Sequence, residues 1–223
     1  MIAQHLASLF SKALLSLLFF LPQDQPLRFE VTSTFTPVSG RLFVVIGDRE
    51  RPEPRSMIDK AGAAAFPVLA RDVRDLGPGV VASIDKTAET FAIGSLDDIK
   101  PGDYYIQALF HSNIDLKSLD ASGTRYSEVR RVHLDPRHGG AVRLELTKML
   151  PPEQLPRDEE YIRYVRIQSK LLTAFHKRPI YLRAAVILPG DYGAGENRRY
   201  PLRIHIGGYG TRFTAVQRLM APG

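Results

Sequence analysis

Strict alternation of apolar and polar residues is the sequence feature that most limits how this chain can fold. In Leu27–Phe35 every second residue, beginning with Leu27, falls on one face of an extended segment. A period of two is typical of a β-strand with one buried face. Arg41–Gly47 is more continuously apolar and is typical of a strand in the middle of a β-structure. This part of the chain therefore predicts strands rather than long helices.

The alternation recurs along the chain between turn signals. We count about seven strands between Leu27 and Lys148, with a charged surface loop expected at 48–60. Ser127–Leu134 and Ala141–Leu146 are predicted to form a hairpin. Alternate residues of its second strand are predicted to face a core while its charged residues face water.

One turn carries a more specific pattern. Ile99–Asp103 places Pro-Gly just before Tyr104, which opens the predicted strand Tyr104–Phe110. This order resembles the tyrosine corner of immunoglobulin-like sandwiches, in which the phenol O–H bonds an upstream backbone group that the turn leaves unpaired. An ordinary turn before an ordinary strand is the alternative. The expected fold class is mainly β, beginning with an immunoglobulin-like antiparallel β-sandwich.

A Pro-rich segment divides the chain. Leu150–Asp158 contains three prolines, which exclude a regular helix or strand there. We therefore expect four parts: an N-terminal signal peptide or hydrophobic segment at 1–25, a β-sandwich accessory domain at 26–149, a Pro-rich linker at 150–158, and a different segment at 159–223.

The N-terminal segment carries the apolar run Ala13–Leu21 after a mildly basic start. A bilayer span needs about 20 apolar residues, so this run is too short to cross, but it has the length of a signal-peptide core. No small-residue cleavage site follows, and an amphipathic N-terminal helix is the alternative. We expect a secreted or periplasmic bacterial protein with no stable membrane span after signal removal.

Composition excludes several classes of function. The chain has no Cys, so disulfide scaffolds, cysteine-ligated zinc, iron–sulfur clusters and thiol catalysis are excluded. It also has no Trp, so an aromatic sugar platform would need Tyr or Phe. The sequence contains no Gly-x-Ser-x-Gly, Walker, HExxH or EF-hand pattern.

The net charge of +6 comes entirely from residues 151–223, which hold 12 basic and 6 acidic side chains. The basic residues are scattered singly, for example Arg163, Arg166, Lys170 and Arg183. This favours a solvated face over an anionic partner, and no nucleic-acid partner is expected.

Two more antiparallel strands are predicted at Tyr161–Leu172 and Pro179–Gly190, connected near Phe175. Tyr200–Gly210 then predicts a third strand that ends in His-x-Gly-Gly-x-Gly. This order of features over Tyr161–Gly210 resembles the start of the α/β-hydrolase domain in esterases of the esterase D/enterochelin-esterase-like family. The preceding sandwich resembles the immunoglobulin-like accessory domain of secreted bacterial members.

The resemblance implies an incomplete α/β-hydrolase sheet, an ester substrate in full-length relatives, and no cofactor or metal. In this family the glycine turn forms part of an oxyanion hole, because backbone N–H groups bind the negative oxygen of the acyl-transfer transition state. Gly208 and Tyr209 are the candidate N–H donors, with His205, Gly207 and Gly210 supporting the turn. A glycine-rich strand exit without a ligand is the alternative.

No catalytic residue is assigned in this chain. The family places its serine, acid and histidine after the oxyanion turn, beyond Gly223. His205 lies on the oxyanion strand and is not the base. The remaining histidines are expected on the surface or in loops: His5, His111, His133, His138 and His176. We therefore expect an N-terminal fragment of an exported serine esterase that is inactive alone.

Adjacent acidic pairs do not support a glycosidase. Asp97–Asp98 and Glu159–Glu160 would point to opposite faces of a strand. Asp97–Asp98 instead predicts a turn or a short helix.

The competing hypothesis is a non-enzymatic secreted binding module for carbohydrate or protein, in which the C-terminal segment completes the sandwich. A secreted structural protein without a ligand is a third. The esterase fragment and the binding module differ in one structural respect. Pairing of Tyr161–Leu188 into the sandwich would favour the binding module, whereas a separate sheet would favour the esterase fragment. The ester substrate, any sandwich ligand and the oligomeric state are not determined by the sequence.

Overall fold

The computed structural model describes residues 25–58, 60–62, 65–193, 198–208 and 210–220. The chain divides into two compact units, 1–151 and 152–223, so that the division falls inside the predicted Pro-rich linker. The predicted signal peptide lies almost entirely outside the described residues.

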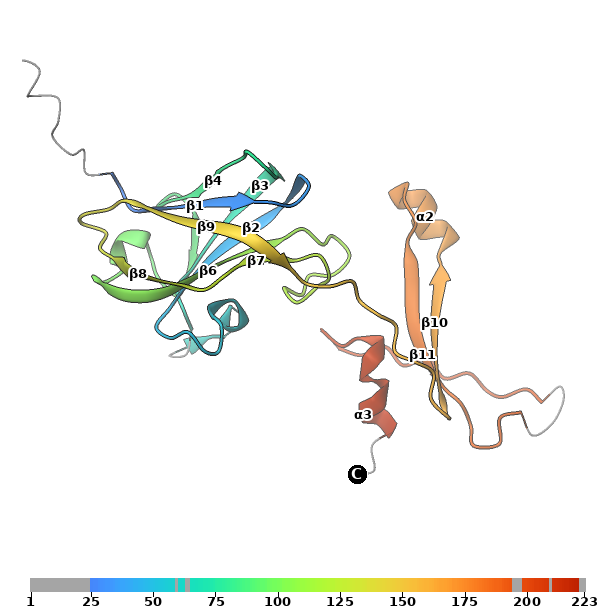
Figure 1. Ribbon diagram of the computed structural model, residues 1–223. Coiled ribbons are helices and arrows are strands. Elements are labelled where there is room, and N and C mark those ends of the chain that lie inside the picture. The colour runs from blue at the N-terminus through green and yellow to red at the C-terminus, as the bar shows by residue number, and fades with distance from the viewer. Residues whose placement is uncertain (1–24, 59, 63–64, 194–197, 209, 221–223) are drawn as a thin grey trace, which may run out of the picture. The chain divides into compact units, whose positions relative to one another are not determined.

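The first unit is built from one mixed sheet of nine strands (Figure 1). These are β1 (Arg28–Ser33), β2 (Val38–Gly47), β3 (Val68–Leu76), β4 (Ala82–Ile84), β5 (Glu89–Phe91), β6 (Gly102–His111), β7 (Arg125–Ser127), β8 (Arg130–Leu134) and β9 (Ala141–Met149). The order across the sheet is β4-β1-β9-β7-β6-β2-β3-β5, and β8 pairs with β6. The predicted mainly-β class is confirmed.

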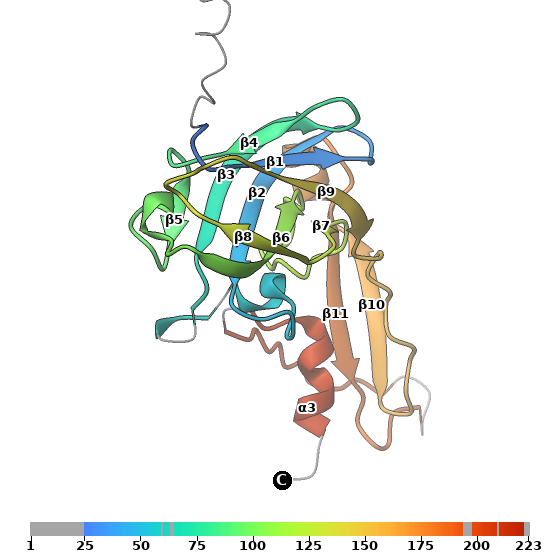
Figure 2. The same ribbon diagram turned by 60° about the vertical axis from the view of Figure 1, so that its left-hand side comes forward.

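A single large core lies between the two ends of this strand order. Its buried apolar side chains come from β1, β4 and β9 and also from β2, β3 and β6. Phe29 and Phe110, one from each group, are fully buried. Strands this far apart in a sheet share a core only when the sheet curls over on itself. Figure 2 shows β1 and β9 crossing in front of β2, β3 and β6.

The strand patterns explain the burial. β1 buries Phe29, Val31 and Ser33 and turns the residues between them outward, as the period of two predicts. The last four residues of β2 are all buried. The outer face of this strand is covered by Phe66 and by residues at the end of the 3-10 helix η1 (Pro54–Met57). The predicted charged loop at 48–60 therefore forms a cover for β2.

The expectation of a purely antiparallel sheet is wrong, because β1 and β9 pair in parallel from Arg28–Ala141 to Ser33–Leu146. The turn before β9 fixes this pairing. The backbone N–H of Arg28 donates to the carbonyl of Gly140 at 2.9 Å, and the N–H of Gly140 donates to the carbonyl of Gln25 at 2.7 Å. These bonds hold the start of the first strand beside the start of the last.

The predicted hairpin of Ser127–Leu134 with Ala141–Leu146 is also wrong. β9 pairs with β7 only as far as Ser127, and β8 pairs with β6 instead. The side chain of Ser127 occupies the point of divergence, where its Oγ accepts from the N–H of Ala108 at 3.0 Å and donates to the carbonyl of Glu128 at 2.8 Å. The alternate burial predicted for β9 is correct, since Val142, Leu144 and Leu146 are buried.

Two local predictions concern turns. The phenol O–H of Tyr104 donates to the carbonyl of Lys100 at 2.8 Å, across the Pro-Gly turn before β6. Asp97 and Asp98 lie in the 3-10 helix η3 (Leu96–Asp98), so the predicted short helix is confirmed. Ser95 caps this helix, accepting from the N–H of Asp97 at 3.2 Å, and its own N–H donates to the carboxylate of Asp98 at 2.7 Å.

The second unit contains the ladder of β10 (Ile162–Gln168) and β11 (Tyr181–Ile187), and the predicted antiparallel pairing is confirmed. The first strand does not extend to Leu172 as predicted. It ends at Gln168, and helix α2 (Lys170–His176) follows. Ser169 caps α2 by accepting from the N–H of Leu172 at 3.2 Å, and Lys177 ends it with φ of 53°. The 3-10 helix η4 (Phe213–Ala215) and helix α3 (Val216–Met220) follow later in the unit.

The predicted third strand at Tyr200–Gly210 is not formed in this structure. Residues 201–207 belong to no strand. Leu202, Ile204 and Ile206 are 82%, 75% and 88% exposed. The alternation that predicted a strand is present, but a strand also needs a partner, and within the described residues none is paired with this segment.

His111 differs from the predicted surface histidines. It ends β6, is partly buried, and its Nδ1 lies 3.2 Å from Oγ1 of Thr124. The exposed His133 and His138 contact Asp103 at 2.9 Å and Asp135 at 2.6 Å. His176 is also exposed, and His5 lies outside the described residues. Burial lowers the pKa of His111, because the imidazolium form loses hydration at this site.

The lowered pKa of His111 predicts a pH dependence of stability. The unfolded chain takes up a proton near pH 6.5 while the folded unit resists it, so the first unit should lose stability as the pH falls from 7 toward 5. Urea titrations at several pH values will measure this loss. His111→Gln should flatten that part of the profile, and an equally steep loss in His111→Gln would contradict the assignment.

Candidate functional site

The glycine bend, residues 207–211, is the candidate site that the sequence analysis selected. The N–H of Thr211 donates to the carbonyl of Gly208 at 3.0 Å and closes a turn. Gly210 has φ of 76°, a conformation that glycine adopts without strain. A Cβ on Gly207 would lie 2.4 Å from Cγ2 of Thr211, so a side chain does not fit there. The shape of the bend therefore depends on Gly207 and Gly210.

Gly208 has a different environment. A Cβ added to Gly208 would meet no atom within 4 Å, and the residue is exposed. The side-chain position of Gly208 is thus open to solvent. Tyr209, the other candidate donor, lies outside the described residues.

Charged side chains position the bend within the second unit. The carboxylate of Glu153 pairs with Arg183 on β11 and with Arg212, which directly follows the bend. Only 18% of the Glu153 side chain is exposed, so one carboxylate screened from water links two cations. This bridge holds the segment after the bend beside β11.

Apolar contacts support the same placement. The rings of Tyr164 on β10 and Phe213 on η4 meet edge to face with centroids 6.1 Å apart. Ile162 and Val216 are buried apolar residues of this unit. The side-chain amide of Gln217 donates to the carboxylate of Glu159 at 3.2 Å. The elements that follow the bend are therefore packed on the β10–β11 ladder.

The segment that leads into the bend is fixed at Tyr200. Its phenol donates to the carbonyl of Asp191 at 2.9 Å, and the guanidinium of Arg198 lies 5.0 Å from the ring centroid. Burial raises the pKa of Tyr200, so the phenol remains a neutral donor. Beyond it, His205 lies exposed in the unpaired segment, and within the described part of the chain no hydrogen bond or ion pair holds it beside the bend.

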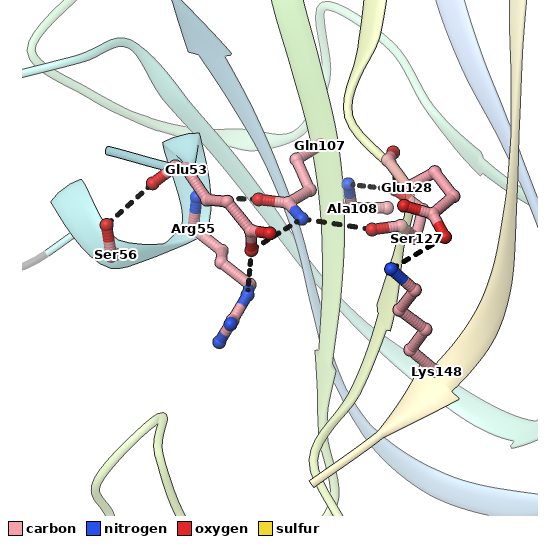
Figure 3. Close-up of polar contacts among 8 residues, drawn as sticks. All are labelled: Glu53, Arg55, Ser56, Gln107, Ala108, Ser127, Glu128 and Lys148. Atoms are coloured by element: carbon pink, nitrogen blue, oxygen red, sulfur yellow. Dashed lines mark hydrogen bonds and ion pairs between the residues drawn. The ribbon is translucent and has the colours of Figure 1, made fainter. Parts of the chain in front are cut away.

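A second polar cluster, which the sequence analysis missed, lies in the first unit (Figure 3). Gln107 on β6 is 1% exposed. Its amide nitrogen donates to the carbonyl of Ser127 at 3.0 Å and to the carboxylate of Glu53 at 3.3 Å, and its amide oxygen accepts from the N–H of Arg55 at 3.0 Å. Gln107 thus fastens η1 to the sheet.

Ionic contacts surround this cluster. Burial of Glu53 acts against ionisation, but hydrogen bonds from Arg55 at 2.7 Å and from Gln107 outweigh it and lower the pKa of Glu53. Lys148 pairs with Glu128 at 2.6 Å. Because the polar groups of Gln107 are used within the chain, we interpret the cluster as structural. Its only sequence signal is a single amide inside the apolar run Tyr104–Phe110.

An open groove of about 560 Å³ lies on the outer face of the first unit where β8 diverges from β9. Its lining combines charged, hydroxyl and aliphatic residues: Glu30, Thr32, Val81, Ser127, Glu128, Arg130, Arg143, Leu144, Glu145 and Thr147. Hydrogen bonds from Arg28 and Arg143 lower the pKa of Glu30. None of these residues is aromatic, so the groove lacks the stacking surface that sugar binding uses. A smaller pocket of about 250 Å³ over β2, β3 and β5 contains Phe43 and Phe91.

No family model matches this chain, and searches of curated proteins and of solved structures also found no match. Within the described residues, no group of three or more His, Cys, Asp or Glu side chains is placed to hold a metal ion. No helix in the described part of the chain is long and apolar enough to cross a membrane. The described structure is that of a mainly-β protein with a large mixed sheet in one unit and a two-stranded sheet in the other.

Proposed function

We propose that this chain is the N-terminal part of an exported serine esterase, in which an immunoglobulin-like sandwich precedes the first strands and the oxyanion bend of an α/β-hydrolase domain. One observation carries the proposal. β10 and β11 form their own two-stranded sheet after the Pro-rich segment and do not join the nine-stranded sheet. The competing binding module requires the opposite arrangement.

The exposure of apolar residues in the second unit supports the proposal. Leu182 and Ile187 on β11 are 53% and 43% exposed, and the segment 201–207 presents Leu202, Ile204 and Ile206 to solvent. Central strands of an α/β sheet need neighbouring strands and covering helices. These side chains are the ones that such neighbours would cover.

The bend can perform the proposed chemistry with its backbone. When a serine attacks an ester, the carbonyl oxygen becomes negative, and an N–H donor already in place stabilises this charge. The N–H of Gly208 is the described candidate, on an exposed residue of the bend. The nucleophile, acid and base come from outside residues 1–223, and the ester is cleaved through an acyl-enzyme without cofactor or metal.

The first unit supports the accessory-domain assignment. Its sheet curls over one core, as the two layers of a sandwich do. The hydrogen bond from Tyr104 to Lys100 has the geometry expected of a tyrosine corner.

The proposal is tested by reading the gene beyond codon 223 and expressing the longer product. We expect a Gly-x-Ser-x-Gly downstream and hydrolysis of p-nitrophenyl acetate by the longer product, with none by the 223-residue chain. Gly208→Pro, which deletes the candidate N–H, should lower kcat roughly 100-fold. Gly190→Ala is the matched control, because its Cβ would meet no atom within 4 Å.

Two results would contradict the proposal. One is a downstream frame without the serine motif. The other is turnover by the 223-residue chain that survives Gly208→Pro. Circular dichroism of each variant separates loss of activity from loss of fold.

The groove on the first unit favours a second candidate function, in which this unit alone binds a partner without any strand from the second unit. Its arginine and glutamate lining suits a polar peptide better than a carbohydrate, since no aromatic side chain lines it.

A further inference from the structure

Helix α2 presents two large apolar side chains to solvent at the tip of the second unit's hairpin. It connects β10 to β11 at the end of the ladder where Gln168 pairs with Tyr181 (Figure 1). Leu171 is 85% exposed and Phe175 is 80% exposed. Residues four apart lie on the same face of a helix, so the two form one apolar patch.

This patch points away from the strands. Thr173, between the two, accepts hydrogen bonds on its Oγ1 from the N–H of Ile180 at 3.0 Å and from the amide of Gln168 at 3.4 Å. Because a helix turns about 100° per residue, Thr173 lies on the side opposite Leu171 and Phe175. The helix therefore contacts the hairpin through Thr173. Among the described residues, the ring of Phe175 contacts only the ring of its neighbour His176, with centroids 5.0 Å apart.

The sequence of the hairpin around the patch is rich in basic residues. Tyr161–Gly190 contains six Lys or Arg residues and no Asp or Glu. Lys170 begins α2 and Lys177 follows it, so the two lysines stand on either side of the patch in the sequence, and both are exposed. The sequence alone favoured a plain solvated face for such residues, but it gave no sign that they flank exposed apolar side chains.

The ladder itself carries unfavourable charge. Arg166 and Arg183 are direct cross-strand partners, an arrangement of like charges that destabilises a sheet. Glu153 compensates Arg183, and Arg166 stacks over the ring of Tyr181 at 3.6 Å from its centroid. The arginines of the strands are therefore partly compensated by acidic partners, and Lys170 and Lys177 are the exposed cations nearest to the patch in the sequence.

We propose that α2 docks on an anionic phospholipid surface, with Leu171 and Phe175 inserted at the level of the upper acyl chains and Lys170 and Lys177 against the lipid phosphates. Apolar anchors flanked by cations are the chemistry of helices that lie at a membrane interface. A second copy is a poorer occupant, because two such hairpins would repel each other. This inference is independent of the proposed esterase.

The absence of tryptophan allows a local test in the full chain. Phe175→Trp creates a single tryptophan in the patch. With vesicles of equal parts phosphatidylcholine and phosphatidylglycerol, we expect its emission to shift to shorter wavelength and to be quenched by lipids brominated in their acyl chains. Phe91→Trp, at an aromatic position 49% exposed on the first unit, is the matched control and should show neither effect.

The contributions of the cations and of the apolar side chains to vesicle binding are measured separately in the Phe175→Trp variant. Reversing both cations, with Lys170→Glu and Lys177→Glu, should lower the vesicle partition coefficient roughly tenfold or more. Leu171→Ser should also lower it several-fold. Leu202→Ser removes an equally exposed side chain elsewhere in the unit and should leave it unchanged.

Four outcomes would overturn the proposal. The tryptophan at 175 could stay unshifted while the protein sediments with vesicles, which would assign membrane binding to another segment. The shift could be equal with pure phosphatidylcholine and insensitive to charge reversal. It could arise without vesicles as protein concentration rises, which would indicate a second copy. It could arise with duplex DNA and not with vesicles, which would indicate a nucleic acid.

Discussion

Replacing Gly139 with alanine is expected to lower the free energy of unfolding of the first unit by about 3–5 kcal/mol. Gly139 has φ of 63°, and an added Cβ would lie 1.7 Å from the carbonyl oxygen of Gln25. No rotation of a methyl group relieves a contact with backbone at this distance. The chain at Gln25 must move, which breaks its hydrogen bond with Gly140 and disturbs the start of the parallel β1–β9 pairing.

Urea titration followed by far-UV circular dichroism measures this loss, and Gly79→Ala is the matched control. Gly79 has φ of 80°, but its Cβ would meet no atom within 4 Å. The control therefore contains the conformational cost of positive φ, about 1–2 kcal/mol, without the collision. Equal losses of unfolding free energy in the two variants would show that the contact with Gln25 is not the cause of the destabilisation.

Gln107→Leu is expected to destabilise the first unit by about 3 kcal/mol. Leucine has a similar size but makes none of the three hydrogen bonds of the buried amide. The N–H of Arg55 and the carbonyl of Ser127 then lose partners, and Glu53 loses one of its two hydrogen-bond donors.

The same titration measures the effect of Gln107→Leu, and Thr90→Val is the control. Thr90 is a polar residue on the edge strand β5 whose hydroxyl donates to the carbonyl of Gly94 at 3.3 Å. Its removal should cost less than about 1 kcal/mol, because water can replace a weak exposed bond. A loss in Gln107→Leu no larger than in the control would contradict a structural role for the cluster. Faster amide exchange across η1 should accompany a true loss.

The sequence predicted those parts of the fold that depend on local pattern. The alternation in β1 and β9 requires one buried face, and both strands formed with it. β3 was not predicted because Arg71, Asp72 and other charged residues interrupt its apolar pattern. These charges are accommodated at the sheet surface, where Arg71 donates to the carbonyl of Ser83 at 2.7 Å and pairs with Asp85 at 3.0 Å.

Pairing between distant strands was beyond the reach of the sequence pattern. Neither the parallel β1–β9 ladder nor the departure of β8 from β9 has a local signal, since each depends on which strand arrives beside which.

The candidate site was likewise predictable from the sequence only in part. The glycines of the bend were predictable from their motif, and Gly207 and Gly210 have steric and conformational reasons to be glycine. The bridge from Glu153 to Arg183 and Arg212 was not predictable, because it joins residues from three separate segments.

The parallel pairing of the first and last strands also affects when the protein can fold during synthesis. Glu30 and Arg143, which contact each other across this ladder, are separated by 113 positions in the chain. Until β9 has been synthesised, β1 lacks its neighbour on one side and the core lacks the buried side chains of β9. The nascent unit therefore cannot close its sheet and core until β9 has emerged from the ribosome.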